Sequence, residues 1–273
     1  MIRNFIVGCL ALPLLVSPAV AGASTLVVDR GLPTTNLNNA AGLSRSNAAW
    51  DDDDANSFYG DSFTLSGAAG TIYDIDTIRT WVVSTATSLG DLFSSVSLFT
   101  GIGGSLSETA TGNFAGAGSN ATSNANISIS SATYVGGVSY QSVGGSPRNM
   151  FEVDFTGLDI QAAAGTTISF GVDGLGVDDP SWFTHASNAA LSGSPQDGAD
   201  GLMMCYARSG AAATSCGVYD SNGDGWDKSS DLNVQVFADV PEPASMALLA
   251  TGVLGIGTIR RRRAGNAGAL LRS

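Results

Sequence analysis

The sequence contains a single histidine, His185, and this scarcity excludes metal sites built from several histidines. Charged residues make up only 13% of the 273 positions, whereas about a quarter is usual in soluble proteins. Basic residues number 12 against 24 acidic ones, and this net charge of -12 argues against nucleic acid as a partner. The chain also lacks the G-x-S-x-G, H-E-x-x-H and phosphate-cradling glycine motifs. We therefore expect a protein that is not an enzyme.

The first 23 residues have the features of a secretory signal peptide. Arg3 supplies the positive start, residues 5–16 form a short apolar stretch, and the small residues Ala19, Ala21 and Ala23 suit cleavage. The apolar stretch is too short for a membrane anchor. The sequence therefore predicts export, with residues 1–23 removed.

Three features follow one another near the C-terminus. They are the short motif Val240, Pro241, Glu242 and Pro243, an apolar run over 245–259, and the basic cluster Arg260, Arg261, Arg262 and Arg263. As a helix the apolar run would measure roughly 23 Å, which is short for a full membrane span. The arginines would stay on the cytoplasmic side. A plain tail anchor is the alternative to a temporary stop-transfer segment.

This ordered set, over residues 240–263, resembles a PEP-CTERM sorting signal. The resemblance implies a Gram-negative bacterium, a short transmembrane helix that holds the exported chain in the inner membrane, and processing by an exosortase, an intramembrane cysteine transpeptidase. It also implies delivery to the cell surface or matrix and an association with exopolysaccharide and biofilm. The sequence departs from the family in its tail, residues 264–273, because family members usually end soon after the arginines.

Between the two terminal signals, residues 24–239 are expected to form one all-β domain, a jelly-roll-like β-sandwich. Short segments rich in β-branched and aromatic residues alternate with Gly, Ser, Asn and Asp clusters. Only the alanines at 162–164 suggest a short helical turn, and 111–131 is expected to be a long loop with an edge strand. The expected strands lie at 25–28, 62–65, 71–83 (one bent strand or two), 92–99, 127–129, 134–140, 151–155, 166–172 and 232–237.

Cys205 and Cys216 remain in the exported domain, because Cys9 leaves with the signal peptide. Their eleven-residue separation suits a bridge across a hairpin or loop, and an exported protein meets an oxidising compartment. We expect a disulfide, with buried or reactive thiols as the alternatives.

The candidate cofactor is calcium. Side-chain oxygens recur at Asp220, Asn222 and Asp224, a glycine follows, and Asp231 stands at the twelfth position of an EF-hand-like loop to which Trp226 could add its carbonyl. The alternative is a hydrated turn, because Asn-Gly and Asp-Gly are strong turn formers. The two terminal segments hold half of the basic residues but only one acidic residue, so the body is strongly acidic. Contact with an acidic polysaccharide would then need a bridging cation.

Two further functions stay open beside a structural or adhesive role. A carbohydrate-binding module would stack sugars on exposed aromatic rings, with Trp50, Trp182, Trp226 and Tyr206 as candidates. A secreted glycoside hydrolase would need two carboxylates about 5–9.5 Å apart. The lone His185 lies among aromatic residues and is expected to be structural.

Overall fold

The body of the chain is built from antiparallel β-strands. The computed structural model describes residues 24–31, 48–49, 57–84, 86, 92–113, 126–132, 140–141, 147–175, 182–185, 197–220 and 231–240. These residues contain no helix, so the all-β class expected from the sequence is confirmed. In this part of the chain no helix has the length and hydrophobicity that crossing a bilayer requires.

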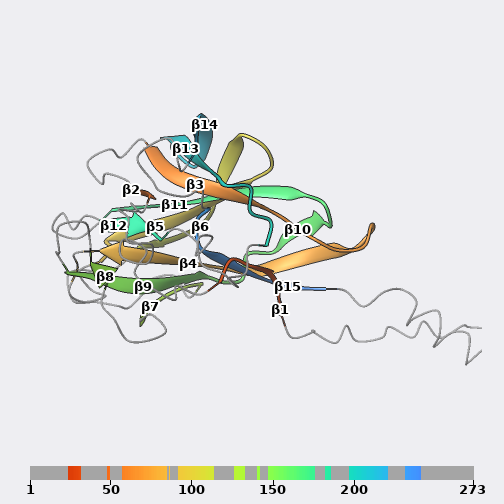
Figure 1. The fold of residues 1–273 in the computed structure, drawn as a ribbon, viewed down its shortest axis with the longest axis horizontal. Helices are drawn as coiled ribbons and strands as arrows, with labels where there is room; N and C mark the ends of the chain where they lie inside the picture. The colour runs from red at the N-terminus through yellow and green to blue at the C-terminus, as the bar shows by residue number, and fades with distance from the viewer. Residues whose placement is uncertain are drawn as a thin grey trace, which may run out of the picture.

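The strands form two sheets that lie one above the other (Figure 1). Sheet A contains β1 (Thr25–Asp29), β15 (Val234–Asp239), β4 (Ile72–Ser84), β9 (Pro147–Phe155), β7 (Ile127–Ala132), β10 (Ile160–Ala163), β12 (Trp182–Thr184), β2 (Ala48–Ala49) and β8 (Tyr140–Gln141). Sheet B contains β11 (Thr167–Leu175), β3 (Ser57–Thr64), β13 (Leu202–Ser209), β14 (Ala212–Asp220), β6 (Ser105–Asn113) and β5 (Ser95–Gly101). Sheet B closes on itself through the β11–β5 pair and forms a six-stranded barrel.

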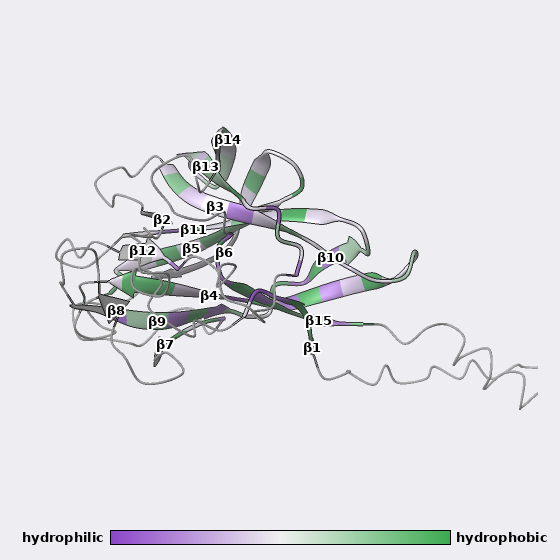
Figure 2. Cartoon of the chain, in the orientation of Figure 1, coloured by the Kyte–Doolittle hydropathy of each residue, from purple (hydrophilic) through white to green (hydrophobic). Residues whose placement is uncertain are grey.

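The main hydrophobic core lies between sheet A and the wall of the barrel. Ile78 and Val82 of β4 belong to the same buried cluster as Leu98 of β5 and Phe170 of β11. This packing follows from the period of two along a strand, which sends alternate side chains to the core. Figure 2 shows hydrophobic and hydrophilic residues following one another along the strands.

A second, smaller cluster contains Phe58, Phe99, Leu106, Tyr206 and Ala213, all contributed by strands of the barrel. Phe58 lies 5.0 Å from Phe99 and 5.6 Å from Tyr206, measured between ring centroids. Aromatic side chains from three barrel strands therefore pack against one another in this cluster.

Two glycines allow a close approach between two strands of the barrel. Gly60 of β3 and Gly171 of β11 lie opposite each other in the ladder. A Cβ atom on Gly60 would lie 2.2 Å from the carbonyl oxygen of Phe170, and one on Gly171 would lie 2.4 Å from the ring of Phe58. Only glycine fits at either position.

Several strand predictions need correction in their extent. The segment 71–83 is one long strand, β4, which agrees with one of its two alternatives, whereas β3 begins five residues before the expected 62–65. Ala162 and Ala163 lie in β10 and not in a helical turn, because they pair with Tyr73 and Ile72 of β4. The cysteine spacing was compatible with the β13–β14 hairpin, but neither β6 nor the barrel was predicted.

The two ends of the described body meet at one end of sheet A. β1 and β15 are antiparallel neighbours, with Thr25 opposite Ala238. In Figure 1 the start of β1 and the end of β15 lie together at the lower right. Both terminal segments therefore join the body at nearly the same place.

Candidate functional site

The last strand ends where the C-terminal signal begins. β15 ends at Asp239, and the following residue, Val240, is exposed. β15 is held on both sides, because it pairs with β1 and with β4. Val234, Val236 and Ala238 are fully buried, so the strand is fixed in register by the core. The predicted residues Pro241, Glu242 and Pro243, and the basic cluster at 260–263, lie outside the described residues.

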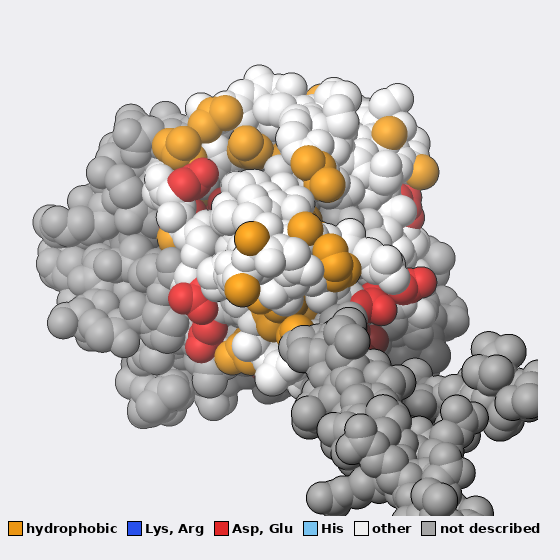
Figure 3. All heavy atoms as spheres, turned by 90° about the vertical axis from the view of Figure 1, so that its right-hand side faces the viewer, with side chains coloured by type: hydrophobic (Ala, Val, Ile, Leu, Met, Phe, Trp, Pro, Cys, Tyr) orange, Lys and Arg blue, Asp and Glu red, His pale blue; other side chains and the backbone are white. Residues whose placement is uncertain are grey.

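The end of the body from which this segment leaves is acidic. Asp239 of β15 lies opposite Asp74 of β4, and burial together with the nearby carboxylates of Asp159, Asp239 and Asp76 raises the pKa of Asp74. Figure 3 faces this end and shows red carboxylate and orange apolar side chains, with no blue basic side chain among the described residues. The exit of the chain is therefore a negatively charged surface with apolar residues on it.

A buried arginine links the two sheets. Arg30 follows β1 and is completely buried. Its guanidinium donates hydrogen bonds to Asp61 Oδ2 (2.9 Å), to the carbonyl oxygens of Gly198 (3.0 Å) and Leu232 (3.3 Å), and to the carbonyl oxygen of Ser62. A buried charge is tolerated when it is paired and hydrogen-bonded, and Arg30 meets this condition.

Asp61 of β3 is the main partner of Arg30. Its oxygens also accept the backbone N–H groups of Ser62 and Leu232, each at 2.6 Å. Burial raises the pKa of Asp61 to about 7, and this effect outweighs the attraction of Arg30, which lowers it. The cluster joins β3 of the barrel to β1 and to the segment that leads into β15.

Asp231, predicted as a calcium ligand, lies beside this cluster. Its carboxylate accepts the backbone N–H groups of Asp200 (2.9 Å) and Gly201 (3.0 Å), and it lies 3.7 Å from Arg30. Carboxylate oxygens of Asp61, Asp200 and Asp231 lie within 4.8 Å of one another. The guanidinium of Arg30 already supplies the positive charge there, so this trio does not fit a metal ion.

The structure does not describe the side chains of the other predicted calcium ligands. Asp220 ends β14, but its side chain is not among those described, and Asn222, Asp224 and Trp226 lie outside the described residues. Calcium binding by this segment therefore stays a prediction.

His185 has a structural position. It is fully buried, and its Nδ1 lies 2.5 Å from Oδ1 of Asn233. The amide of Asn233 donates in turn to the carbonyl oxygens of Arg30 (3.1 Å) and Gly31 (2.8 Å). The histidine thus supports the turn that carries Arg30.

A second arginine cluster lies on the barrel strands. Arg208 of β13 pairs with Asp173 of β11 and with Glu108 of β6 (3.5 Å), and it lies 5.1 Å from the ring centroid of Phe99. Burial raises the pKa of Asp173, although Arg208 opposes the shift. A shallow hollow of about 250 Å³ lies alongside, lined by Glu108, Thr109, Ala110, Thr111 and Ala211. It is open to solvent and is not a cleft that would enclose a substrate.

Tyr206, one of the aromatic residues proposed to stack on sugars, is buried inside the barrel and cannot do so. The side chains of Trp50, Trp182 and Trp226 are not described.

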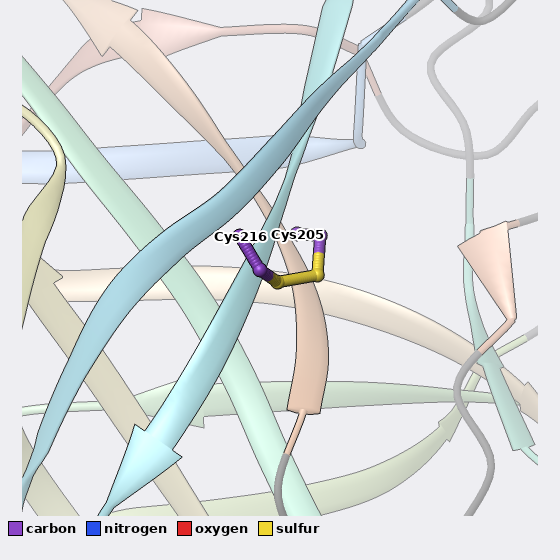
Figure 4. The surroundings of a disulfide bond; sticks show 2 residues. All are labelled: Cys205 and Cys216. Atoms are coloured by element: carbon purple, nitrogen blue, oxygen red, sulfur yellow. A yellow bond between two sulfur atoms is a disulfide. The ribbon is translucent and has the colours of Figure 1, made fainter.

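Cys205 and Cys216 form a disulfide between β13 and β14 (Figure 4). Their Cα atoms are 5.2 Å apart, and the register of the two strands shifts beside them, between Cys205 and Tyr206. The bond therefore fixes a hairpin at its irregular point.

The C-terminal segment matches a family model for the PEP-CTERM protein-sorting motif, over residues 239–263. The chain carries a PEP-CTERM sorting signal. The signal implies export, anchored transit through the membrane and processing by an exosortase. No curated protein and no solved structure matches the chain.

The sorting signal was found from sequence because its parts are contiguous. The Arg30 cluster was not found, because Arg30 and Asp61 are 31 residues apart and Arg30 and Leu232 are 202 apart. The available signal was the rarity of basic residues in the body, which makes each arginine there a candidate partner for several acids.

Proposed function

We propose that the protein is a non-enzymatic component of the cell surface or extracellular matrix of a Gram-negative bacterium. Its role is structural or adhesive, and it contacts exopolysaccharide within a biofilm. The observation that carries this proposal is the PEP-CTERM signal joined directly to the last strand of a β-rich body.

The charged groups of the body support a structural role. The three arginine side chains that the structure describes are all paired with acids: Arg30 with Asp61, Arg79 with Asp154, and Arg208 with Asp173. Glu152 also lies 3.3 Å from Arg79, on the same sheet. Carboxylates held in this way contribute to the fold and are poorly placed for acid–base catalysis, which needs a group free to exchange protons with a substrate.

The test is to follow the full chain in a Gram-negative host that has an exosortase, using an antibody to the body. The triple variant Pro241→Ala, Glu242→Ala and Pro243→Ala should accumulate as a longer, membrane-associated form. The wild-type chain should be shortened and reach the surface or the matrix. Asn266→Ala, in the tail beyond the arginines, is the matched control and should behave as wild type. Equal size and location of the triple variant and the wild type would contradict the proposal.

We also propose that calcium bound by Asp220, Asn222 and Asp224 supports the contact with polysaccharide, because the body is too acidic to approach an anionic polymer unaided. Cells that display the full chain should release it when washed with EDTA and retain it when washed with calcium. The pair Asp220→Asn and Asp224→Asn should be released in either wash. The pair Asp178→Asn and Asp179→Asn makes the same change of charge and should be retained in calcium.

Retention that is equal in calcium and in EDTA would contradict the calcium proposal alone. If retention is equal in calcium and in EDTA and is then lost after enzymatic removal of the polysaccharide, direct sugar binding by aromatic residues is favoured instead. Retention without any polysaccharide would indicate assembly through protein contacts.

A further inference from the structure

We propose that the end of sheet A from which the chain leaves is a contact surface for the processing enzyme. We call this surface the exit face and define it by Leu26, Ile72, Asp74 and Asp159. The inference rests on the proposed processing by an exosortase and adds the part of the body that the enzyme meets.

The chain between the body and the apolar run of the sorting signal is short. Only five residues, 240–244, separate Asp239 from the apolar run that begins at 245, and the connection spans about 20 Å at most when fully extended. The motif at 240–243 occupies the near part of this distance. An enzyme that holds the motif is therefore brought against the body.

β15 cannot lengthen this connection by detaching from sheet A. Its two ladders to β1 and β4 hold it on both sides, and the side chains of Val234, Val236 and Ala238 are buried in the main core. Withdrawing β15 would expose those side chains and break both ladders. The connection between the folded body and the motif therefore cannot be lengthened by releasing β15.

The exit face combines apolar and acidic side chains. Leu26 and Ile72 are 42% and 45% exposed, which is high for large apolar residues. Asp74 and Asp159 lie close enough to repel each other. An anionic lipid surface would be repelled by these carboxylates, whereas a protein surface with basic and apolar groups would complement them. The occupant is therefore a basic extracytoplasmic surface of the transpeptidase and not the bilayer.

The test uses the full chain in the same host and measures the rate of processing by pulse-labelling. Asp74→Asn together with Asp159→Asn removes two negative charges from the exit face. Because these carboxylates repel each other, their neutralisation does not weaken the fold, so misfolding is not the expected cause of a slower rate. Processing should slow on the order of tenfold, the scale of electrostatic effects on association.

The matched control is Asp197→Asn together with Asp200→Asn. It makes the same change of charge on two exposed residues beyond the opposite end of β1, where Asp197 lies beside Asp29. This control should be processed at the wild-type rate. Equal slowing by both pairs would show a general effect of charge and would overturn the proposal.

A flexible insertion tests whether the exit face affects the rate of processing because it lies next to the motif. A Gly/Ser linker of about 20 residues between Asp239 and Val240 adds about 25 Å of average separation. With the linker present, the exit-face pair should no longer slow processing. If the pair slows it equally with and without the linker, or never slows it, the exit face is not the contact surface. The triple motif variant tests the proposed processing separately from the exit-face contact. It blocks processing if the sorting signal is used, whether or not the enzyme contacts the exit face.

Discussion

At the scale of single residues, the buried charge of Arg30 links the two sheets of the body. Its guanidinium is fully enclosed and is matched by Asp61 and by backbone carbonyl oxygens from three segments. Removing it leaves the buried carboxylate of Asp61 without a positive charge beside it and takes a hydrogen-bond donor from several carbonyl oxygens. This penalty exceeds the value of the ion pair alone.

We predict that Arg30→Met lowers the free energy of unfolding by about 3–5 kcal/mol. Arg79→Met is the matched control, because Arg79 also pairs with a carboxylate but has a side chain that is 27% exposed. It should cost no more than about 1 kcal/mol. Urea unfolding followed by tryptophan fluorescence compares the two. Equal losses would show that the Arg30 cluster is not the buried link between the sheets that we describe.

What the sequence could predict at this scale depends on whether a residue acts with its neighbours in the chain. The sorting motif at 240–243 is contiguous and was recognised. The structural position expected for His185 agrees with its burial, but its partner Asn233 is 48 residues away and could not be named. Asp231 was assigned by spacing within a local loop, whereas in the structure Asp200, Gly201 and Arg30, all distant in sequence, surround its carboxylate.

At the scale of the elements, closure of the barrel depends on the glycine pair between β3 and β11. We predict that Gly171→Ala destabilises the protein by about 1–3 kcal/mol, because the added methyl group overlaps the ring of Phe58. Gly104→Ala is the control, since its Cβ would lie 3.6 Å from the nearest atom, the Cβ of Ser215. Thermal unfolding of both variants measures the difference. No loss for Gly171→Ala would mean that Phe58 moves aside freely and that the barrel is loosely packed.

The β13–β14 hairpin depends on its disulfide. The bond closes a loop of eleven residues, and the chain-entropy model gives such a loop roughly 2–3 kcal/mol of stabilisation. We predict that Cys205→Ala with Cys216→Ala lowers the free energy of unfolding by that amount. A reducing agent should lower the stability of the wild type equally and leave the double variant unchanged. A double variant that remains sensitive to the reducing agent would contradict this account.

The strands that the sequence predicted are those that alternate. Residues 151–155 read Phe-Glu-Val-Asp-Phe and form part of β9, with the apolar residues buried and the acidic ones partly exposed. β13 and β14 carry few β-branched residues, and half of β14 is Ala, Gly, Ser or Cys, so no period of two is visible. They are strands because each pairs with a partner distant in the chain, such as β3 or β6.

At the scale of the whole molecule, the fold brings the entry and the exit of the chain together. β15 lies between β1 and β4. Because residues 234–239 come after the other strands of sheet A in the chain, this sheet cannot be completed until they have crossed the membrane. The sorting signal starts directly after this strand. Completion of the body and presentation of the motif are therefore consecutive events at one end of the molecule.

The acidic character of the body also determines how its stability depends on pH. Burial raises the pKa of Asp61 from 3.8 to about 7, and it raises the pKa values of Asp74, Glu152, Asp173 and Asp231 as well. Between about pH 4 and pH 7 the folded protein therefore holds protons that the unfolded chain has released. By linkage, the free energy of unfolding falls as the pH rises through this window and levels off above it.

We predict that the urea midpoint of the wild-type protein is higher near pH 5 than near pH 8. Asp61→Asn removes the carboxyl group whose pKa is raised to about 7. The urea midpoint of this variant should therefore change less between the two pH values. Ionic strength is held constant, because screening alters the repulsion among the exposed carboxylates. A wild-type midpoint that rises with pH would show that Arg30 keeps Asp61 ionised in the folded state. The Arg30–Asp61 pair would then be a permanent ion pair, and burial would not be the effect that sets the pKa of Asp61.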